Sequence, residues 1–342
     1  MPARYKFLLL FFLLAAACLL SLRYGAVAAQ WSDLADLFSK EPGPVARAIL
    51  QFRLPRVLCA IVVGLYLALA GLVFQIVLRN PLADPTIFGV SGGASFAVVL
   101  AMNLVIFFSG SGLASGVATD FLPMGMVPPI ALLGALCATA AVMALAWQDG
   151  LSTMRLVLFG AVVAVILNGF VMALVLSLSE ARTELAILWL AGSLYARDMA
   201  NLLPALPWGI VGIFVILLFA RSLSALQFDA TTAQALGVRT RLSVPVLIVA
   251  AAMLASSAVS VAGPVGFVGL LVPHVARLVF GANLQDRLVG CALIGALLVV
   301  SGDLLGRVAA PPLEVPVGIV TSLIGAPVFA VLMRQEFRKG TA

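Results

Sequence analysis

The feature that most limits how this chain can fold is its series of long apolar stretches. About ten of them could cross a membrane, and the connections between them are short. A helix needs roughly 20 residues to span about 30 Å of hydrocarbon. A hydrophobic fraction of 63% and a charged fraction of 10% exclude an ordinary soluble domain. The sequence therefore predicts an all-α integral membrane protein, with one transmembrane domain over residues 1–342.

The expected spans are bounded by polar or Pro/Gly-rich connections. They are helix 1 at about 7–29, helices 2–5 within about 57–178, helix 6 at about 208–220 and helices 7–10 within about 242–333. Helix 3 is expected to follow the small residues at 88–94, and helix 9 is expected to begin near Leu288. The N-terminal run resembles a signal peptide, because a basic start precedes an apolar run with small residues at its end. An uncleaved helix is favoured, since the run is long enough to span and nine more helices follow. A short surface helix is expected around Trp189–Leu194.

The distribution of charge predicts the orientation of the helices. If both ends are cytoplasmic, the inner segments hold 12 of the 20 Lys and Arg residues and five of the 14 Asp and Glu residues. The outer segments then hold the remaining eight cations and nine acids. The positive-inside rule favours this orientation. The net charge of +6 is not clustered as on a nucleic-acid-binding surface, so no nucleic-acid partner is expected.

The most irregular apolar stretch is Val261–Arg277, which holds three glycines, two prolines and the only histidine of the chain. Such backbone persists at membrane depth only where protein buries it or where it lines a water-filled path. The stretch therefore predicts either part of a transport route or a proline-kinked helix packed for structure alone. A second Pro-rich break, at 79–85, would lie on the opposite side of the membrane. Breaks of opposite sidedness are typical of inverted repeats.

Residues that carry chemistry in enzymes are scarce. The four cysteines are scattered in apolar runs without C-x-x-C spacing, so we expect neither a disulfide framework nor a metal site. A single histidine and the lack of paired carboxylates argue against catalytic residues and a membrane-embedded enzyme. No phosphate-binding loop motif is present, so nucleotide hydrolysis is expected on another chain. An ion-coupled secondary transporter would need ionisable residues in mid-membrane, and only Asp303, near a helix end, comes close.

Seven short strings occur in a fixed order between about residues 53 and 330. They are R-L-P-R (53–56), R-N-P-L-A-D-P (79–85), G-V-S-G-G-A (89–94), W-L-A-G-S-L (189–194), A-x-x-L-G-V (233–238), G-P-V-G-F-V-G-L-L-V-P-H-V-A-R (263–277) and E-V-P-V-G-I-V-T-S-L-I-G-A-P-V-F (314–329). Together they make the chain resemble the FecCD/BtuC-type permeases, the membrane subunits of ABC importers for iron-siderophores, haem and cobalamin. The resemblance implies a ten-helix, inverted-repeat type II ABC importer permease that works by alternating access.

The resemblance also implies partners and a location. The expected partners are a second copy of the chain, two cytoplasmic ABC ATPase subunits, a periplasmic substrate-binding protein and membrane lipid. ATP and Mg²⁺ would bind the ATPase subunits, and no cofactor is expected on this chain. The expected location is the bacterial inner membrane, with both termini cytoplasmic. The identity of the cargo does not follow, because the pathway residues are apolar and shared among cargo types.

The segment 229–238 resembles the cytoplasmic coupling helix that contacts the ATPase. Its expected contact or structural residues are Asp229, Ala233, Leu236, Gly237 and Val238. An aspartate can cap the start of such a helix and a glycine can end it. The alternative interpretation is a solvated loop helix.

Three arginines, Arg53, Arg56 and Arg307, match family positions that meet carboxylates on the two lobes of the binding protein. Charge pairs of this kind steer docking more than they add affinity. Interfacial arginines can instead extend toward lipid headgroups. Arg307 could also pair with Asp303, one helical turn earlier.

Eight residues are candidates for the pathway or its gate. They are Asn168, Gly263, Pro264, Gly266, Gly269, Pro273, Thr321 and Ser322. Hydrogen bonds between helices explain the polar ones as well. His274 is interpreted as structural, because it belongs to a motif shared across cargo types.

Overall fold

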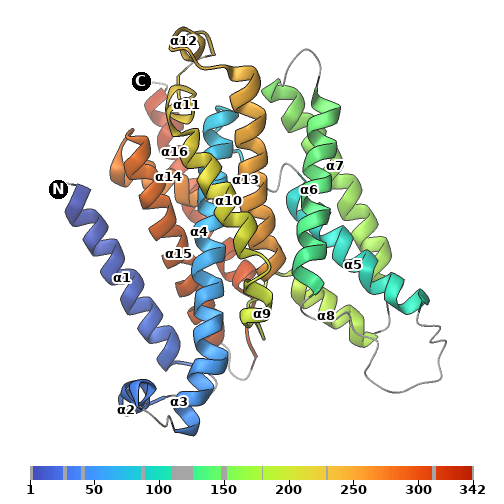
Figure 1. The fold of residues 1–342 in the computed structure, drawn as a ribbon, viewed down its shortest axis with the longest axis vertical. Coiled ribbons are helices and arrows are strands. Elements are labelled where there is room, and N and C mark those ends of the chain that lie inside the picture. The colour runs from blue at the N-terminus through green and yellow to red at the C-terminus, as the bar shows by residue number, and fades with distance from the viewer. Residues whose placement is uncertain are drawn as a thin grey trace. The chain divides into compact units, whose positions relative to one another are not determined.

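The computed structural model describes residues 3–25, 29–39, 43–85, 89–108, 126–147, 152–178, 180–228, 230–309 and 313–340. These residues form helices and connecting turns, with no β-strand among them (Figure 1). The chain divides into two compact units. The first comprises Met1–Leu72, Ala191–Asp198 and Val265–Ala342, and the second comprises Val73–Leu190 and Met199–Pro264.

The first unit is built on helices from both ends of the chain. It contains α1 (Ala3–Arg23), α2 (Trp31–Ala35), η1 (Asp36–Phe38), α3 (Pro44–Ala48), the π-helical turn η2 (Ile49–Arg53), most of α4 (Leu54–Val77), α14 (Val268–Phe280), α15 (Leu284–Val308) and α16 (Val317–Gly340). Helix α15 contacts α1, α14 and α16. The N-terminal helix is therefore packed against the C-terminal part of the chain.

The second unit is organised around α13 (Thr240–Ala262), which contacts α5, α6 and α10. Its other helices are α5 (Val90–Phe108), α6 (Val127–Ala146), α7 (Thr153–Val175), α8 (Glu180–Leu190), α9 (Met199–Leu202), α10 (Leu206–Leu218), α11 (Ala220–Ala225) and α12 (Ala230–Ala235). Every described residue of α13 from Leu254 to Ala262 is buried. Helix α13 is thus the core helix of this unit.

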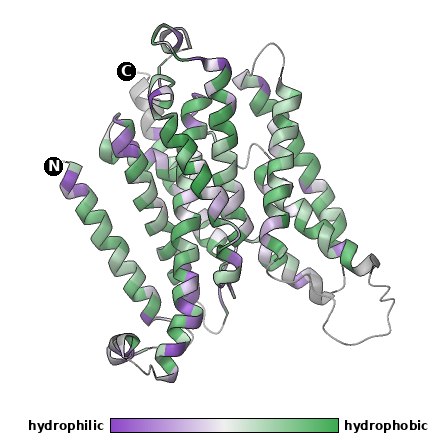
Figure 2. Ribbon diagram, in the orientation of Figure 1, coloured by the Kyte–Doolittle hydropathy of each residue, from purple (hydrophilic) through white to green (hydrophobic). Residues whose placement is uncertain are grey.

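Each of the ten predicted spans corresponds to an apolar helix. Among the described residues, six helices are long and apolar enough to cross a membrane: α1, α6, α7, α13, α15 and the continuous stretch that ends with α4. Shorter apolar helices lie in α5, α10, α14 and α16. Figure 2 shows apolar residues along α1, α7 and α10, and hydrophilic residues around α3 and α12. The total of ten spans stays a prediction.

Close packing of α4 depends on glycine. A Cβ atom added at Gly71 would lie 1.9 Å from the carbonyl oxygen of Gly269 in α14. A Cβ atom added at Gly64 would lie 2.1 Å from the carbonyl oxygen of Gly295 in α15. The backbones therefore touch where no side chain could fit, as is typical of small residues between membrane helices.

Three expected helix boundaries are wrong. Helix α15 begins at Leu284, not near Leu288, because the side chain of Asn283 accepts a hydrogen bond from the Gln285 amide and caps the helix. The string G-V-S-G-G-A lies largely inside α5, which begins at Val90. Helix α1 begins at Ala3 and ends at Arg23, six residues before the expected end.

The expected surface helix at W-L-A-G-S-L is also misplaced. Helix α8 ends at Leu190, and Gly192 adopts a left-handed φ of 73°. The hydroxyl of Ser193 then accepts a hydrogen bond from the Tyr195 amide at 3.0 Å, which forms a turn. The string therefore spans the end of a helix, because glycine favours the left-handed backbone that stops one.

The variant Gly71→Val should destabilise the protein by about 1–3 kcal/mol or more, because its side chain would overlap the Gly269 carbonyl. The unfolding temperature in detergent measures this effect. Gly169→Val in α7 is the matched control, since nothing lies within 4 Å of a Cβ added there. If both variants unfold at the same temperature as the wild type, the close contact between α4 and α14 is contradicted.

Candidate functional site

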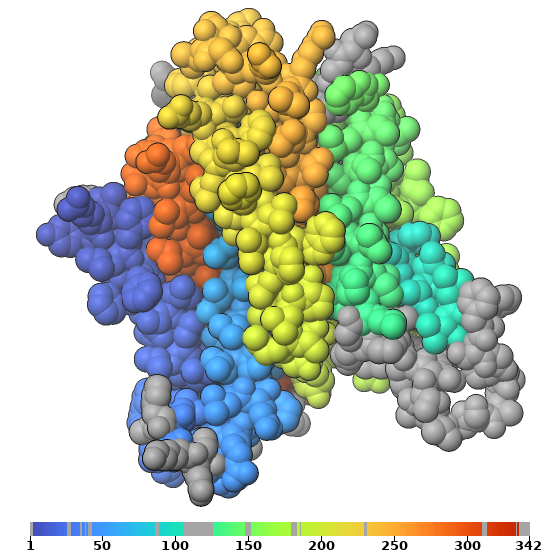
Figure 3. Space-filling view, viewed as in Figure 1, coloured from blue at the N-terminus to red at the C-terminus, as the bar shows by residue number. Residues whose placement is uncertain are grey.

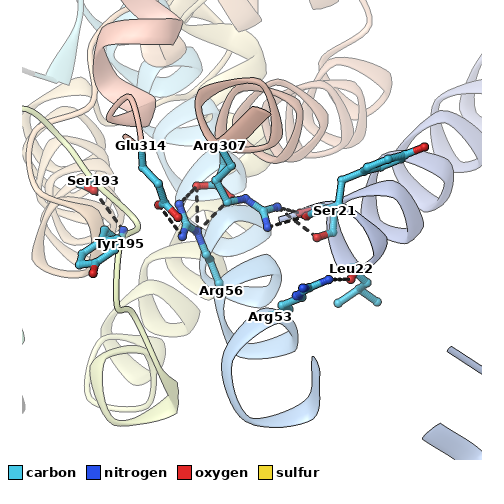
Figure 4. A network of polar contacts seen from close by, with 10 residues as sticks. Ser21, Leu22, Arg53, Arg56, Ser193, Tyr195, Arg307 and Glu314 are labelled. Atoms are coloured by element: carbon cyan, nitrogen blue, oxygen red, sulfur yellow. Dashed lines mark hydrogen bonds and ion pairs between the residues drawn. The ribbon is translucent and has the colours of Figure 1, made fainter. Parts of the chain in front are cut away.

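Arg56 and Asp303 form the centre of an ion network in the first unit. Figure 4 shows Arg56 of this network between Glu314 and Arg307. The Arg56 Nε atom lies 3.1 Å from each Asp303 carboxylate oxygen, and Nη2 lies 2.8 Å from Oδ1. The remaining Arg56 nitrogen, Nη1, lies 2.8 Å from Oε2 of Glu314. All three guanidinium nitrogens of Arg56 therefore face carboxylates of this chain.

Arg307 shares the same aspartate. Its Nε atom lies 3.2 Å from Oδ2 of Asp303, so the predicted alternative partner of Arg307 is confirmed. We call Arg56, Asp303, Arg307 and Glu314 the α4–α15 network. Asp303 is 3% exposed and Arg307 is 8% exposed. Buried charges of this kind are tolerated only because they are paired and hydrogen-bonded.

The arginines also hold the C-terminal end of α1. Arg307 donates hydrogen bonds to the carbonyl of Tyr24 at 3.0 Å and to the carbonyl and hydroxyl of Ser21. Arg53 donates to the carbonyls of Leu22 and Arg23 at 2.8 and 2.9 Å. The last carbonyls of a helix have no partner within it. The two arginines satisfy them and fix α1 to the unit.

The three arginines predicted to dock a binding protein lie in one region, and each contacts groups of this chain. Arg56 and Arg307 are engaged by Asp303 and Glu314, and Arg53 by α1. Their role in docking a partner stays a prediction.

The coupling segment forms a short helix with an abrupt end. Helix α12 covers Ala230–Ala235, and Asp229 lies outside the described residues. Gly237 has a left-handed φ of 83°, and the Val238 amide donates to the Ala233 carbonyl at 3.1 Å. The prediction that Gly237 ends this helix is confirmed.

Fewer of the expected contact residues in this segment are exposed than the sequence predicts. Ala233 is fully buried within the chain, whereas Leu236 is 62% exposed and Val238 is half-buried. Ala233 therefore packs against this chain itself, and Leu236 supplies the large apolar surface that is open to a partner.

The predicted break in Val261–Arg277 is present. Helix α13 ends at Ala262, Gly263 has a φ of 73°, and α14 begins at Val268 after Phe267, which has a φ of 67°. A Cβ atom at Gly263 would lie 2.1 Å from the Trp189 carbonyl oxygen. Glycine is thus needed both for the turn and for the close approach.

The other candidates from this stretch lie in packed surroundings. Pro264 is half-buried, and Pro273 and His274 are buried, the latter two within α14. Gly269 packs against Gly71, and a Cβ atom at Gly266 would lie 3.2 Å from the Ser322 hydroxyl oxygen. Their part in a pathway stays a prediction.

The polar pathway candidates are found in separate units. Asn168 is exposed on α7, in the second unit. In the first unit, the hydroxyls of Thr321 and Ser322 donate to the Gly318 carbonyl at 3.1 and 2.7 Å. Both hydroxyls are therefore satisfied within α16, and the structure gives no direct contact that would test a lining role.

Two residues of interest were missed in the sequence. Glu314 lies in a proline-rich stretch of the sequence, and only the three-dimensional contact with Arg56 reveals its role. Arg197 is 8% exposed in the segment between α8 and α9. Burial lowers the pKa of its guanidinium, and nearby Cys59 and Asp198 partly oppose that shift. No local pattern marks either residue.

These features define a class of protein: a helical membrane protein whose apolar helices are interrupted by a packed break and a short connecting helix, as in transport proteins. The chain belongs to the FecCD transport family, whose model matches residues 13–335.

Its relatives extend over almost the whole chain. It is 33% identical to the iron-uptake system permease protein FeuC of Bacillus subtilis, over 98% of each chain. It is 34% identical to the ferric enterobactin transport system permease protein FepG of Escherichia coli, over 96% of each. A solved ABC transporter assigned to the metal-chelate type, in an inward-facing conformation, matches with 29% identity and a TM-score of 0.81, over 97% of this chain and 99% of that one.

The variant Asp303→Asn should lower the free energy of unfolding by roughly 3 kcal/mol or more, because the buried Arg307 loses its carboxylate and Arg56 keeps only Glu314. Chemical or thermal unfolding in detergent measures this loss. Glu314→Gln is the comparison and should have a smaller effect, since the Glu314 side chain is 27% exposed and pairs with one arginine. Wild-type stability in Asp303→Asn would show that the network does not hold the unit together.

Proposed function

We propose that this chain is the permease subunit of an ATP-driven importer, which moves an iron-siderophore, haem or cobalamin-like chelate from periplasm to cytoplasm by alternating access. The observation that carries the proposal is similarity over nearly full length to permeases named for iron uptake and ferric enterobactin transport. The metal-chelate type of the solved relative supports the same cargo class. Ferric siderophores are therefore the first cargo to test.

The proposed complex contains two copies of this chain, two ATPase subunits and a periplasmic binding protein. ATP and Mg²⁺ would bind the ATPase subunits. Apolar side chains on α7 and α16 support burial of these helices against lipid or a second copy, since Met172 is 64% exposed and Leu323 is 74% exposed. Both termini would be cytoplasmic, as the positive-inside rule indicates.

Closure of the ATPase subunits would act through α12. This helix contacts α11 and α13, and the exposed Leu236 follows it directly. Helix α13 then continues for 23 residues to the break at Gly263. A displacement applied at α12 could therefore reach the broken stretch along one packed helix.

Docking of the binding protein is proposed at Arg53, Arg56 and Arg307. Because Glu314 already pairs with Arg56, a carboxylate from the binding protein would share or replace that contact. Glu314 is the more exposed of the two network acids, and so it is the one that can be displaced at lower cost.

The α4–α15 network favours ATP-driven transport over ion coupling. A carrier carboxylate must bind and release its ion or proton. Asp303 is buried between two arginines, and both of its carboxylate oxygens contact their nitrogens. Neither oxygen is therefore open to a transported cation.

The variant Leu236→Asp should reduce stimulation of ATPase activity by cargo-loaded binding protein at least tenfold, because a charge replaces the apolar contact with the ATPase. The purified permease–ATPase complex in lipid is the sample to assay. Leu236→Met is the control, since it keeps an apolar side chain at the same exposed position. Full stimulation of the Leu236→Asp complex would rule out this coupling contact.

A further inference from the structure

A cavity of about 550 Å³ opens in the second unit, and the exposed Leu236 is one of the residues that line it. Its wall comes from α11, the turn that ends at Phe228, the residues after α12 and the first turn of α13. Figure 3 shows these segments in yellow to orange at the top of the view. Leu236, Gly237 and Val238 of the coupling segment form part of the same wall. The coupling role proposed above uses these residues and assigns nothing to the polar and charged residues opposite them.

The charge of the cavity is one-sided. Arg221 and Arg239 both line it, and both are exposed. None of the described residues in its wall is acidic. Within the described part of the chain, neither arginine side chain forms an ion pair or a hydrogen bond. The cavity therefore offers two guanidinium groups to a ligand from outside the chain.

The start of α13 adds one further donor to the same wall. The amides of Thr240, Leu242 and Ser243 already donate to the carbonyls of Val238 and Arg239, so the donor that this turn offers is a side chain. Ser243 lines the cavity and is 3% exposed. Its hydroxyl makes no hydrogen bond within the described part of the chain. A buried hydroxyl and two arginines together favour an oxyanion with several acceptor oxygens.

The position of the cavity identifies the source of that anion. Helix α13 is long and apolar enough to span a membrane, so its first turn, which carries Leu242 and Ser243 of the cavity wall, is expected where a membrane meets water. Phosphate groups of lipids are concentrated at that level. Phe228 is 57% exposed and Leu242 is 56% exposed beside the arginines, which provides apolar contacts for the lipid chains.

We propose that this cavity binds the phosphate group of an anionic phospholipid. Basic pockets at the ends of membrane helices recognise lipid headgroups in this way. Inorganic phosphate has the same charged oxygens, but it cannot use the apolar rim. The assignment does not depend on the importer function proposed above.

The test is binding of phosphatidylglycerol to the full-length protein in neutral detergent, measured by native mass spectrometry. The double variant Arg221→Gln/Arg239→Gln should bind this lipid at least tenfold more weakly than the wild type. Ser243→Ala should weaken binding to a smaller extent. Arg241→Gln is the matched control, because Arg241 is exposed in the same helical turn but does not line the cavity. Its affinity should change by less than threefold.

Two further arms separate the possible sources of the anion. Phosphatidylcholine and inorganic phosphate should each bind the wild type more weakly than phosphatidylglycerol. Equal affinity for inorganic phosphate would overturn the lipid assignment, as would wild-type lipid binding by the double variant. If the double variant instead keeps the lipid and loses its ATPase partner, the cavity is a protein-docking site and the proposal is wrong. Should the double variant not fold, the single change Arg221→Gln at the exposed α11 position gives the same comparison.

Discussion

The structure depends on one constraint: charges inside an apolar helix bundle must be paired. Asp303 meets this constraint with Arg56 from α4 and Arg307 from its own helix, while Glu314 holds the remaining nitrogen of Arg56. Because Arg307 and Arg53 also bind the last carbonyls of α1, the same contacts fix the N-terminal helix. Removal of a single carboxylate would thus loosen α1, α4 and α15 together.

A second constraint concerns the backbone: helices come into direct contact only where glycine leaves room for them. Gly64 and Gly71 let α4 touch α15 and α14, and Gly263 allows the chain to turn beside Trp189. The irregular stretch that suggested a transport route is therefore tightly packed within each unit. Packing and transport are compatible, because irregular backbone at membrane depth must be supported wherever it occurs.

Much of the fold follows from local sequence patterns. Apolar runs predict an apolar helix for each expected span, Gly237 predicts the end of α12, and the spacing of Asp303 and Arg307 predicts their pair. Long-range contacts could not be predicted in this way. Glu314 reaches Arg56 only after the chain has folded, and Arg197 becomes buried only through the packing of its segment. The start of α15 was misjudged because polar residues after Asn283 belong to a capped first turn and not to a loop.

The central claim is that transport through this chain is driven by ATP hydrolysis on a partner subunit. The most direct measurement is uptake of a radiolabelled ferric siderophore into proteoliposomes that contain the permease, its ATPase and the loaded binding protein. The account predicts uptake that requires ATP on the ATPase side and persists when proton and sodium gradients are collapsed. Uptake by the permease alone, driven by an ion gradient and indifferent to ATP, would contradict it.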